Sequence, residues 1–411
     1  VYLQLIAQTL RQGKQALVLI PEIGLTPQTL SRFEQRFATE IAVLHSGLGD
    51  GQRYRAWDAA RTGRARIVIG TRSAVFTPLR KAGLIIVDEE HDASYKQQDR
   101  FRYSARDVAV KRGQLEDCPV LLGSATPSLE SLHNALSGKY AHHRLHQRAG
   151  GSALPGVKVI DVRRAPLQAG LSDDLIDALE QTLQSGSQCL LFLNRRGYAP
   201  TLQCHDCGWI AECHQCDARL TVHRRQRRLR CHHCGASQPL PGRCPQCHSG
   251  ALLAAGLGTE QTDGFLRGRF AQWPIYRVDS DTMQGRESMH ELVTEINRGE
   301  PCILLGTQML TKGHHFPAVS LVGVIDTDAM LFSADFRGEE RMAQLLTQVA
   351  GRAGRAKTPG RVLLQSHYPD HPALLAMLEN PFAEYARELL SRRQQSGLPP
   401  AGKLVIVRTD C

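Results

Sequence analysis

Two series of short, uniformly apolar runs constrain this chain more than any other feature. The first series lies at residues 16–20, 65–69, 84–87 and 120–122, and the second at 188–193, 275–278, 302–305, 319–325 and 362–365. Runs this short suit strands that are buried on both faces, and the stretches between them leave room for crossover helices. The sequence therefore predicts an α/β protein with two doubly wound parallel sheets, one in each of two lobes.

The length of 411 residues suffices for two or three domains. We expect a first lobe over residues 1–150 and a second over 151–396, joined near the Gly-Gly-Ser sequence at 150–152. Between residues 203 and 252 the apolar runs give way to Cys, His and Arg, which predicts a module inserted into the second lobe. Residues 397–411 are expected to begin a further domain. Because the first helical stretch lacks a capping residue, we also expect the sequence to be part of a longer one.

The inserted segment carries four Cys-x-x-Cys pairs. Their members are Cys204, Cys207, Cys213, Cys216, Cys231, Cys234, Cys244 and Cys247. Two such pairs supply four thiolates to one tetrahedral Zn²⁺, so four pairs predict two closed structural zinc sites. Disulfides are the alternative, but the cysteines at 118, 189 and 302 lie in apolar surroundings typical of a reducing compartment. We favour a nested pairing, in which the two inner pairs share one ion and the two outer pairs share the other.

The loop between the inner pairs, residues 223–230, holds five arginines in eight residues. Guanidinium groups on a rigid platform suit contacts with phosphate, whereas the alternative is a solvated charged face. Replacing Arg224, Arg225, Arg227 and Arg228 with Ala should flatten the salt dependence of DNA binding if the first interpretation holds. The formal net charge of +10 agrees with a polyanionic partner.

Acidic residues directly follow the apolar run at 84–87. Asp88 and Glu89 would lie at the carboxyl edge of a sheet, where α/β folds bind ligands. We expect Asp88 to hold the Mg²⁺ that bridges nucleotide phosphates, and Glu89 to orient and deprotonate the attacking water. In the second lobe, Arg352 and Arg355 follow Gln348 in a Gly-Arg repeat, which suits the stabilisation of charge on a transferring phosphoryl group.

These residues, in this order, resemble the motifs of superfamily 2 helicases, and the cysteine-rich insert resembles that of the PriA (primosomal protein N′) family. The matching segments are residues 20–26, 70–76, 88–91, 123–126, 193–198, 306–314 and 348–355. The resemblance implies two RecA-like lobes that use ATP and Mg²⁺, with two Zn²⁺ in the insert. It also implies a catalytic role for His91 and places Gly313 beside Gln348, Arg352 and Arg355 at the nucleotide.

The same resemblance implies contacts with DNA. The residues that it assigns to DNA are Arg72, Phe101, Arg102, Tyr103, Arg106 and Lys312. Aromatic and basic residues alternate in the stretch 96–107, which suits base stacking combined with phosphate contacts. Without the resemblance this stretch would be a surface loop.

The resemblance further implies a 3′-to-5′ DNA helicase that starts replication restart by primosome assembly at stalled or abandoned forks. Its implied partners are forked and single-stranded DNA, the primosome proteins PriB and DnaT, and single-strand DNA-binding protein, and the helicase is expected to act as a monomer. There are two alternatives: another superfamily 2 translocase, or a non-catalytic zinc-ribbon protein that binds nucleic acid.

One element of the family pattern does not occur in these 411 residues. A Gly-rich loop that ends in Gly-Lys-Ser/Thr, which would hold the β- and γ-phosphates, is missing from the sequence. We therefore expect these residues by themselves to bind ATP poorly and to turn it over slowly. No apolar run approaches the roughly 18 residues of a membrane span, so we expect a cytoplasmic protein without a membrane partner.

Overall fold

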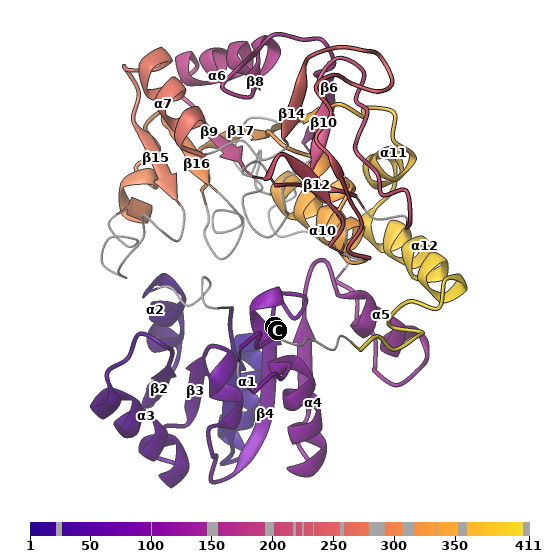
Figure 1. The fold of residues 1–411 in the computed structure, drawn as a ribbon. Coiled ribbons are helices and arrows are strands. Elements are labelled where there is room, and N and C mark those ends of the chain that lie inside the picture. Colours follow the sequence, from indigo (N-terminus) through magenta and orange to yellow (C-terminus); the bar gives the residue numbers. More distant parts are fainter. Residues whose placement is uncertain are drawn as a thin grey trace. The chain divides into compact units, whose positions relative to one another are not determined.

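Two parallel sheets organise the chain, one in each of two units, Val1–Ala135 and Leu136–Cys411 (Figure 1). The computed structural model describes residues 1–21, 27–99, 101–145, 155–193, 201–216, 219–223, 226–232, 234–254, 259–278, 292–306, 316–333, 335–351 and 360–405. The predicted join at residues 150–152 lies outside these ranges.

The first unit holds a five-stranded parallel sheet with the order β2-β3-β1-β4-β5. Its strands are β1 (Gln15–Leu19), β2 (Ile41–Leu44), β3 (Ile67–Gly70), β4 (Ala82–Asp88) and β5 (Val120–Gly123). The helices are α1 (Tyr2–Arg11), α2 (Pro27–Arg36), α3 (Asp50–Thr62), α4 (Ala105–Leu115) and α5 (Leu129–Leu136), with short 3₁₀ turns η2 (Arg72–Phe76) and η3 (Ala93–Tyr95).

Strand β1 shows why the apolar runs form this sheet. Leu17 and Leu19 pack into a hydrophobic cluster on one face, whereas Ala16 and Val18 pack into a second cluster on the other. Successive side chains of a strand point to opposite faces, so a strand covered on both sides must be apolar throughout. Edge strand β2 alternates between buried and half-buried residues, and it is therefore absent from the strands that uniformly apolar runs predict.

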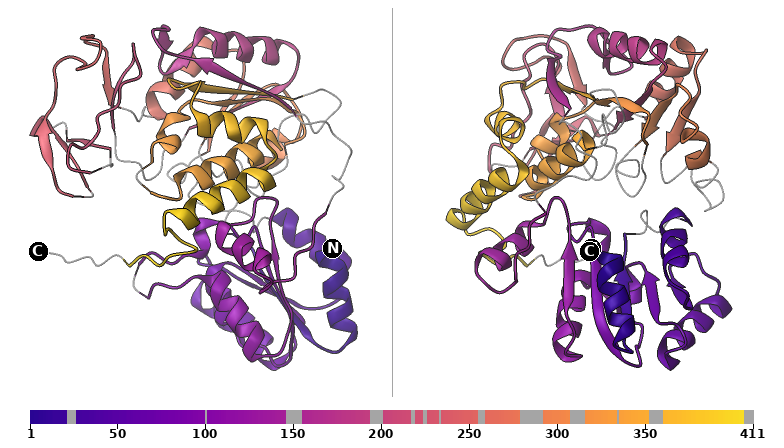
Figure 2. Two further views of the ribbon diagram at one scale, coloured as in Figure 1. Left: turned by 90° about the vertical axis from the view of Figure 1, so that its right-hand side faces the viewer. Right: turned by 180° about the vertical axis from the view of Figure 1, so that it is seen from behind.

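The second unit holds a six-stranded parallel sheet with the order β15-β16-β9-β17-β18-β6. Figure 2 draws the ribbon of this unit from two further directions. Its strands are β6 (Gly156–Asp161), β9 (Gln188–Phe192), β15 (Ile275–Val278), β16 (Ile303–Gly306), β17 (Val319–Val324) and β18 (Arg361–Ser366). The helices include α6 (Asp173–Gln184), α7 (Thr259–Arg269), α9 (Asp328–Leu331), α10 (Gly338–Ala350), α11 (Pro372–Glu379) and α12 (Phe382–Gln395). A small hairpin, β7 (Leu167–Gln168) and β8 (Leu171–Ser172), precedes α6.

Two hydrophobic clusters cover the two faces of this second sheet. Leu190 and Phe192 of β9 belong to one cluster, and Cys189 and Leu191 belong to the other. The expectation of two doubly wound parallel sheets is confirmed. The edge strand β6 was missed, because most of its residues are exposed and it has no apolar run.

The cysteine-rich module is inserted between β9 and β15, in the second unit as predicted. It consists of a two-stranded ladder, β10 (Leu202–Cys204) with β14 (Leu252–Ala254), and of the antiparallel strands β11 (Thr221–His223), β12 (Arg228–Arg230) and β13 (Ser237–Pro239). Its own core is small, with Leu220, Val222 and Leu229 at its centre. In the described part of the chain, no helix is both long and apolar enough to cross a membrane.

Candidate nucleotide site and metal centres

Asp88 is the last residue of β4 and pairs with Gly123 at the end of β5. It therefore lies at the carboxyl edge of the sheet, as the sequence predicts. The hydroxyl of Tyr2 donates to Asp88 Oδ1 over 2.9 Å, and the hydroxyl of Tyr95 donates to the carbonyl oxygen of Asp88 over 2.7 Å. Burial raises the pKa of Asp88, and the hydrogen bond from Tyr2 opposes that rise. One carboxylate oxygen is thus held in place by the first turn of α1.

The close approach of α1 explains the glycine at position 123. A Cβ atom there would overlap the hydroxyl of Tyr2. Only glycine leaves room for the hydrogen bond between Tyr2 and Asp88 while β5 keeps its pairing with β4.

Glu89 follows Asp88 with a backbone φ of 46°, in the left-handed region that non-glycine residues rarely adopt. Such strain often accompanies functional positions. The Glu89 side chain is 40% exposed, and the His91 side chain beside it is only 5% exposed, with Nδ1 lying 3.6 Å from Glu89 Oε2. His91 Nδ1 also lies 2.7 Å from Ser124 Oγ. This hydrogen bond links the acidic segment 88–91 to the segment 123–126.

Glu90 forms a second and more deeply buried link, from the acidic segment to residues 128–131 and to α4. It is 2% exposed, and its Oε1 accepts the backbone N–H of Ser128 over 2.7 Å. Its Oε2 accepts hydrogen bonds from the Ser128 and Ser131 hydroxyls over 3.0 and 2.8 Å, and from Arg106 Nη1 over 3.2 Å. The carboxylate therefore joins β4, α4 and the start of α5.

Arg106, which the sequence assigned to DNA, is mostly internal. Its side chain is 17% exposed, and it pairs with Glu90 and with the more exposed Asp107. Burial by itself would lower the pKa of Arg106, but the carboxylates of Asp107 and Glu90 outweigh it and raise the pKa. Arg72, also assigned to DNA, donates to the carbonyl oxygen of Ser94 over 2.8 Å. Both guanidinium groups thus brace the loop that follows Asp88, and their DNA contacts stay predictions.

Three aromatic rings lie together on the first unit. Tyr103 is 4.9 Å from Phe76 and 5.9 Å from Phe101, measured between ring centroids. Phe101 is 75% exposed and Phe76 is 54% exposed. Arg102 lies in the same segment and donates to the carbonyl oxygen of Gln98 over 3.1 Å. The arrangement can present a stacking surface to solvent, and Phe76 is a member that the sequence did not single out.

In the second unit, Gln348 lies half-buried on α10. The remaining residues that the sequence assigned to the nucleotide or to DNA there, Lys312, Gly313, Arg352 and Arg355, lie outside the described residues. Their roles stay predictions.

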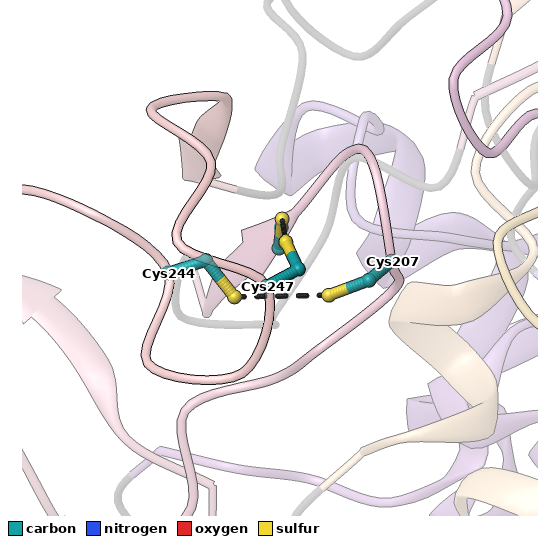
Figure 3. Close-up of side chains that lie close together, drawn as sticks. Cys207, Cys244 and Cys247 are labelled. Atoms are coloured by element: carbon teal, nitrogen blue, oxygen red, sulfur yellow. Dashed lines mark hydrogen bonds between the residues drawn. The ribbon is translucent and has the colours of Figure 1, made fainter.

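The eight cysteines form two groups of four. One group contains Cys204, Cys207, Cys244 and Cys247, and the other contains Cys213, Cys216, Cys231 and Cys234. The sulfur atoms of each group lie within 4.8 Å of one another, and Figure 3 shows Cys207, Cys244 and Cys247 of the first group turned toward a common point. The nested pairing is therefore confirmed.

The sulfur spacing tests whether these groups fit zinc. The Sγ atoms of Cys204 and Cys247 are 3.6 Å apart, and those of Cys213 and Cys234 are 3.5 Å apart. A tetrahedral ion with Zn–S bonds of about 2.3 Å places its ligands about 3.8 Å apart, whereas a disulfide brings sulfur atoms to about 2.05 Å. The geometry fits two closed Cys₄ zinc sites.

A buried polar chain attaches the zinc module to the second sheet. Asp328, which is 5% exposed at the start of α9, accepts the Ser366 hydroxyl over 2.6 Å and lies 2.9 Å from His367 Nδ1. His367 Nε2 in turn lies 3.1 Å from Nδ1 of His205, which stands between two zinc ligands. His205 Nε2 lies 2.8 Å from the carbonyl oxygen of Ala165. The outer zinc site is thereby joined to the edge of the sheet.

Several of these residues escaped the sequence reasoning. Tyr2, Glu90 and Asp328 were not singled out, although Glu90 stands inside the quoted segment 88–91. A buried carboxylate between Glu89 and His91, both of which were assigned to catalysis, leaves no periodic signal that tells a structural partner from a catalytic one. Tyr2 contacts Asp88, and Asp328 contacts His367, only because the fold brings distant segments of the chain together.

Comparisons with known proteins agree with this geometry. A family model described as "DEAD/DEAH box helicase" matches residues 1–135, one described as "PriA DNA helicase Cys-rich region (CRR) domain" matches residues 213–239, and one described as "Helicase conserved C-terminal domain" matches residues 255–357.

Curated relatives match nearly the whole chain. The replication restart protein PriA of Haemophilus influenzae is 52% identical over 400 residues, which cover 97% of this chain and 55% of that protein. The protein of the same name from Bacillus subtilis is 41% identical over 410 residues, which cover 99% of this chain and 51% of that protein. The chain thus spans about half the length of these relatives.

Solved structures share the fold at low sequence identity. RecG bound to a three-way DNA junction is 14% identical, with a TM-score of 0.51, over 92% of this chain and 40% of that one. The helicase MrfA bound to DNA and AMPPNP is 13% identical, with a TM-score of 0.52, over 93% of this chain and 46% of that one. Both likenesses concern the fold of the parallel-sheet lobes, each taken by itself.

Proposed function

Because this chain belongs to the PriA family of superfamily 2 helicases, we propose that it is the motor portion of an ATP-dependent DNA helicase that restarts replication at stalled or abandoned forks. The observation that carries the proposal is the position of Asp88 and Glu89. Asp88 ends a central parallel strand and Glu89 directly follows it, in a chain that is 52% identical to a replication restart protein.

The proposed chemistry in the first unit uses three neighbouring side chains. Bound Mg²⁺ would neutralise charge on the nucleotide phosphates, and Asp88 is the residue that would hold it. Tyr2 donates to one oxygen of that carboxylate, which holds the group in a constant orientation. The half-exposed Glu89 carboxylate would orient a water molecule and accept its proton, and His91 would keep Glu89 in place while it contacts Ser124.

The contact between His91 and Ser124 gives the proposal a route for coupling. A movement or protonation of the Glu89 carboxylate would change the surroundings of the buried His91 imidazole. The imidazole contacts Ser124, in the loop that leads through Ser128 into α5. Glu90 holds the other end of the same loop. We expect these paired hydrogen bonds to transmit the state of the phosphates to the DNA-binding side of the lobe.

Arg352, Arg355, Gln348 and Gly313 are proposed to serve the nucleotide from the second lobe. Two guanidinium groups suit the charge that develops on a transferring γ-phosphoryl group. Lys312 and Arg72 are proposed to contact the DNA backbone.

Single-stranded DNA is the proposed ligand of the aromatic rings of Phe101 and Tyr103. Their spacing of 5.9 Å and the exposure of Phe101 support base stacking. Arg102 would add a phosphate contact, whereas Arg106 would act mainly through Glu90.

The finer features of the proposal are 3′-to-5′ movement, hydrolysis of ATP with Mg²⁺, and assembly with PriB, DnaT and single-strand DNA-binding protein. The names of the relatives support a role in replication restart. We propose that the protein performs this role in the cytoplasm as a monomer. The two Cys₄ groups are proposed to hold structural Zn²⁺ with no catalytic part, because four thiolates leave the ion no open position.

The test uses the whole protein in which this chain occurs. Glu89→Gln keeps the shape of the side chain but removes the base, and we expect DNA-stimulated ATP hydrolysis to fall by about 10²- to 10⁴-fold together with unwinding of forked DNA. Glu34→Gln, an exposed position on α2, is the matched control and should retain both activities. ATP hydrolysis by the Glu89→Gln protein at the rate of the control would contradict the assignment. A wild-type protein that binds DNA and zinc without hydrolysing ATP would favour the non-catalytic alternative.

A further inference from the structure

A pocket of about 390 Å³ lies in the second unit, where the zinc module meets the end of the six-stranded sheet. Its lining residues are Trp209, Ile210, Glu212, Arg219, Gln246, Phe332, Tyr368 and His371. The nucleotide chemistry proposed above uses none of them. The volume is near the lower end of the range for ligand pockets, about 300–1,000 Å³. It suits a planar ring system together with part of the chain that carries the ring.

Aromatic rings form the floor of this pocket. Phe332 and Tyr368 are 4.5 Å apart with their planes inclined at 67°, and His371 is edge-on to Phe332 at 5.4 Å. The Arg219 guanidinium lies over the Phe332 ring, 4.6 Å from its centroid, and pairs with Glu212 over 2.9 Å. Trp209, Phe332 and Tyr368 are each only half-buried, so each ring keeps some exposed surface beside the pocket.

The outer zinc site builds one wall of the pocket. Trp209 stands two residues after the ligand Cys207, and its carbonyl oxygen accepts the backbone N–H of Cys204 over 2.7 Å. Gln246 lies inside the knuckle between Cys244 and Cys247. The other wall comes from the sheet, and the Tyr368 hydroxyl donates to the carbonyl oxygen of Gly208 to join the two. The pocket therefore depends on a module that zinc holds in shape.

We propose that this pocket receives one unstacked base of single-stranded DNA. Every base has a π-face, so aromatic walls bind bases of any sequence, and an arginine at the rim can stack on the base or contact the adjoining phosphate. The inference rests on the proposed function in one respect, namely that the chain acts on DNA.

The test is an equilibrium titration of the zinc-loaded chain in the absence of ATP. Trp57 and Trp273 are replaced by Phe, which leaves Trp209 as the sole tryptophan and makes its fluorescence a report on the pocket. One probe is an oligothymidine, and the other is an oligomer of the same length and charge made of abasic residues. We expect the oligothymidine to quench Trp209 and the abasic oligomer to leave its emission nearly unchanged.

A substitution then separates base stacking from phosphate binding. Phe332→Leu keeps apolar bulk against the core but removes the π-face, and it should weaken oligothymidine binding about fivefold to tenfold, the lower part of the range for one stacked base. Its affinity for the abasic oligomer should change less than about twofold. Tyr54→Leu, at an exposed aromatic position on α3, is the matched control and should change neither affinity.

The outcomes distinguish the two proposals. Equal quenching by both oligomers, or an equal loss of affinity for both in Phe332→Leu, would overturn the base pocket while leaving DNA binding intact. Quenching by an aromatic peptide but not by oligothymidine would reassign the pocket to a protein partner. A chain that binds neither oligomer would count against the proposed function as well.

Discussion

The buried carboxylate of Glu90 offers a quantitative test of the first unit. Glu90→Gln keeps the size of the side chain, and its amide oxygen can still accept the Ser128 N–H. In that orientation its NH₂ group, a donor, faces the Arg106 guanidinium. Removing one partner of a buried ion pair costs about 3–5 kcal/mol. Arg106 retains Asp107 at 3.0 Å and the Ser128 hydroxyl at 2.6 Å, so we expect a smaller loss, about 2–3 kcal/mol of the free energy of unfolding.

The assay follows the unfolding of the first unit in urea. Trp57 lies in that unit and the other two tryptophans do not, so a background with Trp209→Phe and Trp273→Phe makes the emission specific. Asp107→Asn is the matched control. It removes the other carboxylate partner of Arg106, but the Asp107 side chain is 65% exposed, and its loss should cost at most about 1 kcal/mol.

The result that would refute this reasoning is a Glu90→Gln loss no larger than that of Asp107→Asn. The urea m-value should stay constant, because the surface exposed on unfolding does not change. Adding Arg106→Gln to Glu90→Gln should recover part of the loss, since the double variant no longer buries an unpaired guanidinium.

Three further predictions concern the second unit. Cys213→Ser should lower the zinc content from two ions to one per chain and abolish protection of the β12 amides from hydrogen exchange, because the small module core needs its metal. The control Cys118→Ala should keep both ions. Unchanged protection in Cys213→Ser would contradict a structural role for the metal. Replacing both Arg227 and Arg228 with Ala should reduce the slope of log affinity against log salt by about 1.4 for single-stranded DNA, and an unchanged slope in the titration would leave the hairpin a solvated or protein-binding face. Burial raises the pKa of Asp326 from 3.8 to about 6, so the free energy of unfolding should fall by up to about 3 kcal/mol as the pH rises through that window. Asp326→Asn should remove this part of the fall, measured by urea titrations at pH 4 and pH 7. An identical pH dependence in the variant would refute the prediction.

Local features of the sequence predicted the metal centres and the central strands. Two closed Cys₄ sites follow from the spacing of four knuckles, since two cysteines separated by two residues already converge on one ion. The sequence favoured the nested pairing without deciding it, and the structure brings the inner pairs together and the outer pairs together. Central strands such as β1 and β9 were predictable because burial on both faces demands apolar side chains at every position. Edge strands β2 and β6 carry no such requirement, and the uniform pattern therefore failed there.

The sequence by itself thus determined the fold class, the eight thiolates, and the place of Asp88 at the end of a strand. Only the tertiary structure decided which side chains meet at those places. Tyr2 reaches Asp88 across 86 residues of chain, Glu90 reaches Ser131 across 41, and His205 reaches His367 across 162. Such contacts depend on the order in which strands stack side by side, and no periodicity along the chain encodes that order.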